Sequence, residues 1–166
     1  MLRRHVIGLL TLPLLAPRLV QALVSTSTEA LLTVSGRARA SQPLAVTVFD
    51  MPMLARLPQH SFSTRTPWYP QARKFTGPLL RDVLSAAGVQ GTLLRAVALN
   101  DYQVDIPAED TLRYDVLLAR LLDDQPMPVR DKGPLFIIYP FEQQADLRNA
   151  RYYSRCAWQV KAIEVQ

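Results

Sequence analysis

The chain has 166 residues, enough for one domain, with a formal net charge of +5 and 49% apolar residues. Three basic residues and no acidic residue lie within residues 1–22, so the formal charge of the remaining chain is only +2. A surface this close to neutral has no strong field for a phosphate backbone, which excludes nucleic acid as an expected partner.

Residues 1–22 have the pattern of an export signal. Arg3 and Arg4 precede the apolar run VIGLLTLPLLA, and VQA supplies the small residues that cleavage after Ala22 requires. The run is short for a membrane span, which leaves an uncleaved anchor as the alternative. We therefore expect a signal peptide over residues 1–22 and a single domain over residues 23–166, located in the periplasm or secreted.

The first half of this domain predicts strands and two short helices. ALLTVSGRA and PLAVTVFD read as strands joined by a turn, Asp50 as the cap of a helix over MPMLARL, and HSFSTRT as an edge strand. TGPLLRDVLSAAGV gives the clearest helix, with Thr76 or Gly77 at its N-cap and Gly88 just past its end.

The second half is richer in strands. LLRAVALNDYQVDIP predicts a hairpin with a turn at Asn100-Asp101, whereas RYDVLLARLLDDQPM fits either a helix or strands. PLFIIYP predicts a buried strand, EQQADLRNA a helical piece, and YYSRCAWQVKAIEV one or two closing strands. The expected fold class is α+β, a strand-rich mixed sheet or barrel-like core with two or three short helices.

Several kinds of site are excluded by composition. Beyond residue 22 the sequence has one histidine, His60, and one cysteine, Cys156, too few for a zinc, haem or iron–sulfur centre. The sequence has no G-x-S-x-G, G-x-G-x-x-G or Walker motif. Cys156 is expected to be a buried, small apolar side chain.

Four segments between Phe75 and Val165 nevertheless resemble a known family. They are FTGPLLRDVLSAAGV, LRAVALNDYQVDIPAED, YDVLLARLLDDQPMPVRDKGPLFIIYP and YYSRCAWQVKAIEV. Their order is similar to that of the oxidoreductase molybdopterin-binding domain, which has the sulfite oxidase-like fold. The resemblance implies this fold for residues 23–166, with the segment after Val129 lying beside the pterin.

The same resemblance marks where this chain departs from catalytic members. Their molybdenum-ligating cysteine would fall near Thr64 or Arg65, where no cysteine stands, and a hydroxyl does not replace a soft thiolate. Lys132 stands in place of the histidine that precedes Gly133 in those members. Leucine and phenylalanine follow where an arginine would hold phosphate.

We therefore expect a binding module without cofactor that uses the old pterin crevice for a small anionic or polar ligand. A second hypothesis is a partner protein that docks onto the periplasmic sensor domain of a membrane protein. The alternative is a molybdopterin-dependent oxidoreductase with an atypical metal ligand set; no catalytic or metal-ligating residue is predicted. The expected ligand-binding residues are Arg65, Trp68, Tyr69, Asn100, Asp101, Tyr102, Arg130, Lys132 and Gly133.

Overall fold

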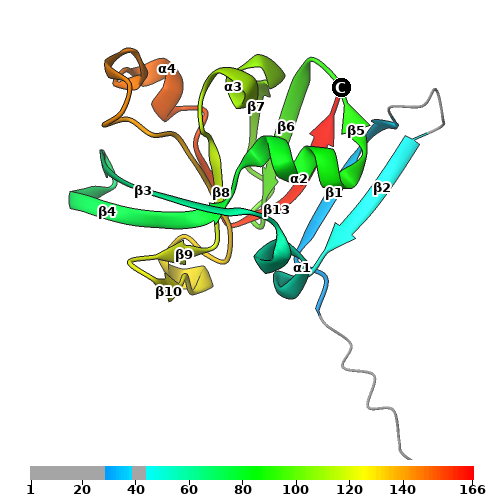
Figure 1. Ribbon diagram of the computed structural model, residues 1–166, viewed down its shortest axis with the longest axis horizontal. Helices are drawn as coiled ribbons and strands as arrows, with labels where there is room; N and C mark the ends of the chain where they lie inside the picture. The colour runs from blue at the N-terminus through cyan, green and yellow to red at the C-terminus, as the bar shows by residue number, and fades with distance from the viewer. Residues whose placement is uncertain (1–28, 39–43) are drawn as a thin grey trace, which may run out of the picture.

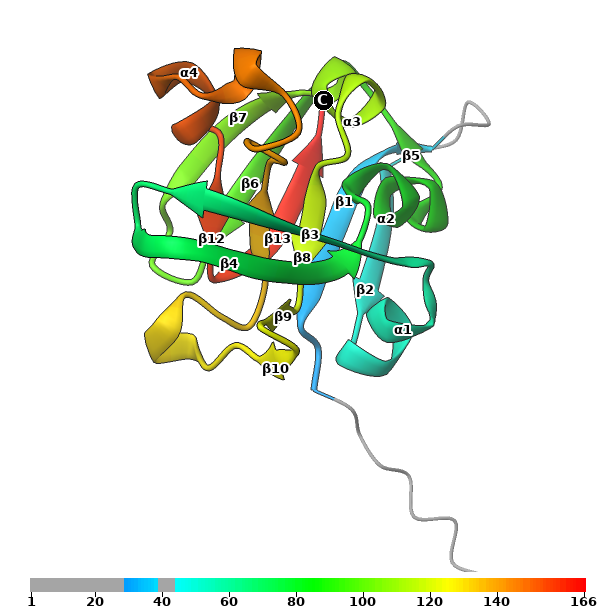
Figure 2. The ribbon, with the colours of Figure 1, turned by 60° about the vertical axis from the view of Figure 1, so that its left-hand side comes forward.

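The computed structural model describes residues 29–38 and 44–166. The predicted export signal and the turn between the first two strands lie outside these described residues. Within them, three sheets and four α-helices pack into an α+β domain, which confirms the predicted fold class. A hairpin crosses in front of the largest sheet (Figures 1 and 2).

The largest sheet has six strands, in the order β2-β1-β13-β6-β7, with β5 pairing at the end of β1. Its strands are β1 (Leu32–Ala38), β2 (Leu44–Phe49), β5 (Val89–Gln90), β6 (Leu93–Ala98), β7 (Gln103–Pro107) and β13 (Val160–Val165). β1 runs parallel to β13, and every other pair is antiparallel. The predicted hairpin is β6 and β7, and Asp101 in its turn has a φ of 64°.

Two smaller sheets lie against this one. The first, in the order β10-β9-β4-β3, contains β3 (Gln59–Thr66), β4 (Tyr69–Pro78), β9 (Leu121–Leu122) and β10 (Gln125–Pro126). The second, in the order β12-β11-β8, contains β8 (Leu117–Ala119), β11 (Phe136–Ile138) and β12 (Ala157–Trp158). β3 is an edge strand, as predicted, and β11 is fully buried, as predicted.

The segment that the sequence left open between helix and strand forms β8, β9 and β10. Asp123 and Asp124 connect β9 to β10 with φ values of 48° and 64°. Two successive residues with positive φ form the tight turn that matches the twist of a hairpin, and aspartate tolerates this conformation. Because of this turn the segment forms strands, although its leucines have the spacing of a helix.

The helices are short. They are α1 (Met51–Arg56), α2 (Leu80–Ala87), α3 (Ala108–Arg113) and α4 (Ala150–Tyr153), with 3-10 turns η1 (Val129–Asp131) and η2 (Ala145–Leu147). Asp50 caps α1 as predicted, because its carboxylate accepts the backbone N–H of Met53 at 2.6 Å. The described residues thus form four α-helices, where the sequence predicted two or three.

The start of α2 was predicted two or three residues too early. The predicted caps Thr76 and Gly77 belong instead to β4, and the N-cap is Leu79. The reason is tertiary: β4 packs so closely on β8 that a side chain at Gly77 would lie 2.1 Å from the carbonyl oxygen of Leu118. The C-terminal end is as predicted, with Gly88 in the left-handed conformation at φ 69°.

The core is continuous between the three sheets and α2. Its largest fully buried side chains are aromatic: Phe75, Phe136, Tyr139 and Phe141. Cys156 is 4% exposed, which confirms the expected burial. Among the described residues, no helix has both the length and the apolar character needed to cross a bilayer.

Candidate functional site

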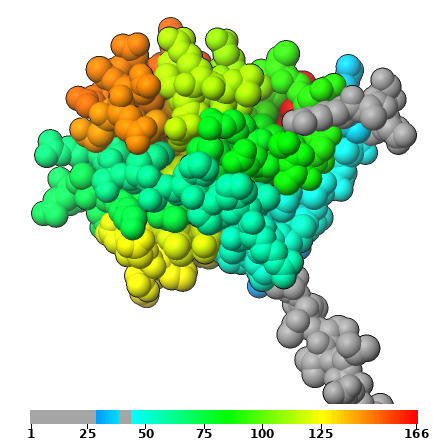
Figure 3. Space-filling model, in the orientation of Figure 1, coloured from blue at the N-terminus to red at the C-terminus, as the bar shows by residue number. Residues whose placement is uncertain are grey.

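The tip of the β3–β4 hairpin is the centre of the candidate site. Figure 3 shows this hairpin (teal to green) crossing the molecule below the α4 segment (orange) and above the segment around β9 and β10 (yellow). Trp68 and Tyr69 lie where β3 passes into β4, and the N–H of Trp68 donates to Thr66 Oγ1 at 3.3 Å. Three clefts open around this tip.

The first cleft, here called the aromatic cleft, has a volume of about 360 Å³. Its lining residues are Trp68, Ala98, Asn100, Tyr102, Tyr153, Ser154, Cys156, Ala157 and Trp158. The two indoles meet nearly perpendicularly with ring centroids 5.5 Å apart, and the ring of Tyr153 stands edge-on to Trp68 at 6.3 Å. None of the lining residues is charged.

The second cleft, here called the cationic cleft, has a volume of about 380 Å³. Its lining residues are Tyr69, Arg73, Leu122, Gln125, Pro126, Met127, Pro128, Arg130, Asp131 and Lys132. Lys132 lies between the two clefts, because its Nζ is 4.9 Å from the ring centroid of Tyr69 and 5.9 Å from that of Trp158. Burial raises the pKa of the Tyr69 hydroxyl above its usual range.

The structure therefore does not bring the nine predicted ligand-binding residues together in one cleft. Trp68, Asn100 and Tyr102 line the aromatic cleft, whereas Tyr69, Arg130 and Lys132 line the cationic cleft. Arg65 lines a third, more open cleft of about 410 Å³ with residues of the segment before α4.

Two predicted residues line none of these clefts. Asp101 forms an exposed ion pair with Lys161, with 2.6 Å between carboxylate oxygen and Nζ. Gly133 is buried against Met127, where an added Cβ would lie 1.8 Å from the carbonyl oxygen. Gly133 thus contributes to the shape of the loop and offers no contact to a ligand.

Sequence reasoning missed six residues of the aromatic cleft: Ala98, Tyr153, Ser154, Cys156, Ala157 and Trp158. All but Ala98 come from YYSRCAWQV, which was predicted as part of one or two strands and forms the end of α4, a short connection, β12 and the start of β13. The two adjacent tyrosines and the tryptophan were the available signal, since a dense aromatic cluster beside a free thiol is typical of a cleft wall as well as of a core.

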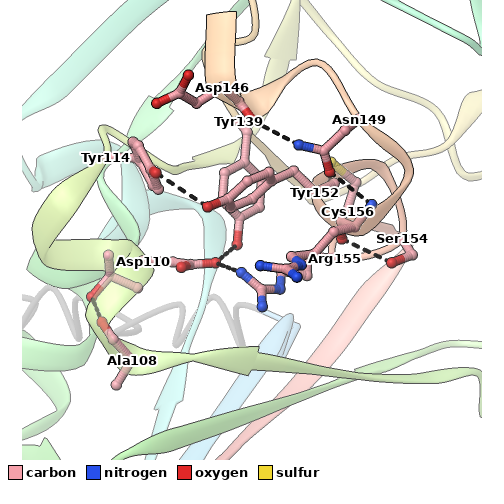
Figure 4. A network of polar contacts seen from close by, with 12 residues as sticks. Ala108, Asp110, Tyr114, Tyr139, Asp146, Asn149, Tyr152, Ser154, Arg155 and Cys156 are labelled. Carbon is pink, nitrogen blue, oxygen red and sulfur yellow. Dashed lines mark hydrogen bonds and ion pairs between the residues drawn. The ribbon is translucent and has the colours of Figure 1, made fainter. Parts of the chain in front are cut away.

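A buried polar network holds α4 against α3 (Figure 4). Both the hydroxyl of Tyr139 and Nη1 of Arg155 donate to Asp110 Oδ2 at 2.7 Å. The hydroxyls of Tyr114 and Tyr152 lie 3.1 Å apart. Burial raises the pKa of Tyr139 far above its usual value, with the hydrogen bond to Asp110 adding to this effect. The network therefore fixes the element that supplies Tyr153 and Ser154 to the aromatic cleft.

The residues present do not fit a molybdenum centre. At the position implied for the ligating cysteine, Thr64 is buried and its hydroxyl donates to the carbonyl oxygen of Arg65 at 3.4 Å. Burial raises the pKa of Cys156 well above its ordinary value, so its thiol is neutral, and thiolate is the form that binds metal. The described residues contain no cluster of three or more metal-ligating side chains.

The comparisons with known proteins agree with the fold. Residues 54–144 match the model of the oxidoreductase molybdopterin binding domain. The chain belongs to this family. No curated protein sequence matches the chain.

Among solved structures, the sulfane dehydrogenase SoxCD from Paracoccus pantotrophus is similar, with a TM-score of 0.62 and 17% identity. The match covers 83% of this chain and 38% of that one, so the chain spans less than half the length of SoxCD. At this identity the likeness shows the sulfite oxidase-like fold. The fold of this family is therefore present here on a chain that has a buried threonine, Thr64, at the position implied for the metal-ligating cysteine.

Proposed function

We propose that this member of the molybdopterin-binding family is a binding module without cofactor, and that the aromatic cleft holds its ligand. The observation that carries the proposal is the convergence of Trp68, Tyr102, Tyr153 and Trp158 on one cleft of about 360 Å³. Apolar walls with a few polar groups are typical of small-molecule sites, and this volume lies at their lower end. Loss of a metal ligand leaves such a cleft available for another use of the fold.

The polar groups of the aromatic cleft define what it can recognise. Asn100 Oδ1 accepts the N–H of Tyr102 at 3.2 Å, which leaves the amide of Asn100 as a donor. The hydroxyl of Ser154 donates to the carbonyl of Arg151 at 2.8 Å, so its lone pairs remain as acceptors. With aromatic walls, the amide of Asn100, the hydroxyls of Ser154 and the two tyrosines, and no charged lining residue, the cleft suits a small, flat, uncharged heteroaromatic ring.

The tryptophans provide a direct test. The chain has two, and both line the aromatic cleft, so selectively excited tryptophan fluorescence reports directly on this site. We expect saturable quenching by at least one of nicotinamide, uracil and adenine, measured at constant absorbance. Tyr102→Ala should weaken this binding at least about fivefold, since stacking of a ring on an aromatic side chain contributes ~1–3 kcal/mol.

The matched control is Leu112→Ala, which truncates another exposed large side chain, on α3 and outside the cleft. It should leave the quenching curve unchanged. Absence of saturable quenching by all three probes, or equal affinity of the wild type and Tyr102→Ala, would contradict the proposal.

The proposal includes export and a partner. Residues 1–22 support export by their charged start, apolar run and small-residue end, and cleavage after Ala22 would release residues 23–166 into the periplasm or medium. There the module would report ligand binding to the periplasmic sensor domain of a membrane protein. Co-purification from a periplasmic extract tests this step, and repeated recovery as a free monomer would count against it.

A further inference from the structure

The cationic cleft lies on the other side of the hairpin tip from α4 and has a different chemistry. Three of its lining residues are cations, Arg73, Arg130 and Lys132, and one is an anion, Asp131. Tyr69 stands at its centre: Arg73 Cζ lies 5.3 Å from its ring centroid and Lys132 Nζ lies 4.9 Å from it. Arg73 is paired with Asp123, so Lys132 is the cation of this cleft, about 380 Å³ in volume, that has no described carboxylate partner.

The cations of this cleft keep donors that the described residues do not use. Arg73 pairs with Asp123 through Nε, and no described residue accepts from its terminal nitrogens. Arg130 makes one loose contact, 3.6 Å from Nε to Asp131, and its side chain is 86% exposed. Lys132 makes no ion pair with any described carboxylate, and its Nζ rests on two aromatic faces. Several N–H groups are therefore available to an acceptor.

The loop fixes Lys132 before any ligand arrives. Its backbone adopts the left-handed conformation with φ 71°, and its carbonyl accepts the N–H of Gln159 at 3.2 Å. The side chain of Gln159 donates to the carbonyl of Val129 at 2.6 Å, which ties the start of the loop to the same residue. Behind Lys132, Gly133 packs against Met127 at a distance that only glycine allows. The backbone that carries this cation therefore needs little ordering when an anion binds.

We propose that the cationic cleft is a binding site for a small oxyanion, with Lys132 as its main contact and Arg73 and Arg130 as flanking donors. Ammonium and guanidinium groups form strong charge-assisted hydrogen bonds to phosphate, sulfate and carboxylate oxygens. The site is separate from the ligand of the aromatic cleft and does not depend on it. The shared chemistry is an oxygen-bearing anion, either a free tetrahedral anion or the carboxylate of a larger molecule.

Isothermal titration calorimetry of the full chain tests this site. The probes are inorganic phosphate, sulfate and acetate, each added at constant ionic strength set with sodium chloride. The variants are Lys132→Met and Lys132→Arg, and the matched control is Lys161→Met, which removes the same charge from a lysine that pairs with Asp101 outside the cleft. A thermal melt of each variant without anion, together with its tryptophan fluorescence, establishes that it folds.

We expect saturable heat with at least one oxyanion for the wild type and Lys161→Met, at least tenfold weaker binding for Lys132→Met, and retained binding for Lys132→Arg. A response to phosphate or sulfate but not acetate assigns the site to a tetrahedral anion, and the reverse assigns it to a carboxylate. Heat equal to that of added chloride, or unchanged affinity in Lys132→Met, would overturn the proposal. Either of these two results would leave the proposed function of the aromatic cleft standing, because that function is tested by the quenching of tryptophan fluorescence by uncharged rings.

Discussion

Cys156 is the only cysteine of the chain, and its surroundings determine which reactions are open to it. Its side chain lies 4% exposed at the base of the aromatic cleft, and its Sγ donates to the carbonyl of Tyr152 at 3.7 Å. Burial raises the pKa of this thiol, because the uncharged form is favoured away from water. Cys156 therefore acts as a small apolar group of the cleft wall and not as a nucleophile.

The raised pKa of Cys156 predicts a pH dependence of stability. Below the ordinary thiol pKa of about 8.5, the folded and unfolded states both hold the proton. Above it the unfolded thiol ionises while the folded thiol does not, so unfolding is increasingly favoured as the pH rises. We expect the free energy of unfolding of the wild type to fall by about 1.4 kcal/mol per pH unit relative to Cys156→Ala between roughly pH 9 and 10.

Urea unfolding of both proteins from pH 7 to pH 10 measures this difference. The pKa of Tyr139 is also raised by burial, so its ionisation in the unfolded state lowers the free energy of unfolding as well. This effect is the same in both proteins and cancels in the comparison. Parallel curves for the two proteins across this range would mean that Cys156 is accessible to water in solution.

At the scale of elements, α4 depends on contacts far away in the sequence. It has four residues, too few to be stable alone, and the ion pair between Asp110 and Arg155 joins it to α3. The side chains of this pair are 9% and 20% exposed, so removal of one partner leaves a largely buried charge. The pair therefore decides both where α4 lies and where the wall of the aromatic cleft lies.

Arg155→Met should for this reason destabilise the protein by roughly 3 kcal/mol, as expected when a buried ion pair loses one partner. It should also weaken ligand quenching of the tryptophans, because Tyr153 and Ser154 lose their support. Arg95→Met removes an arginine from an exposed pair with Asp105 and should leave the unfolding midpoint nearly unchanged. Equal urea midpoints for the two variants would show that the network adds no more than a surface contact.

A helix or strand can be predicted from the sequence when the interactions that produce it are between residues close together in the chain. The β6–β7 hairpin was predicted correctly because Asn100 and Asp101 carry their own turn chemistry, and α1 because Asp50 caps it. The start of α2 was missed because its cause is the approach of Gly77 to β8, which leaves no pattern in the neighbouring residues. The start of α4 does have a local signal, since the side chain of Asn149 accepts the N–H of Arg151 at 3.0 Å, but its position also depends on the distant pairing of Asp110 with Arg155.

The candidate site divides in the same way. Trp68, Tyr69, Tyr102 and Lys132 were predicted from their chemistry and the family resemblance, and the structure places them around one hairpin tip. That they separate into an uncharged and a charged cleft depends on which side of the hairpin each segment packs. This separation follows from sheet topology, which residue types do not encode.

For the whole molecule, the decisive question is whether the protein binds a cofactor. Native mass spectrometry and metal analysis of protein purified from its native compartment should give the mass of residues 23–166 with far less than one molybdenum per chain. The reason is that the described residues offer no soft ligand in its metal-binding form. Stoichiometric molybdenum would overturn the proposed function in favour of an oxidoreductase with an atypical ligand set.

The pairing of β1 with β13 has a consequence for how the protein reaches its native state. These strands are neighbours in the middle of the six-stranded sheet, and their register joins Thr33 to Ala162. Pairing of residues so far apart in the sequence is slow. These two strands cannot pair until nearly the whole chain has been synthesised. The six-stranded sheet can therefore be completed only after the last strand, β13, has left the ribosome, whereas the local hairpins β3–β4 and β6–β7 can pair earlier.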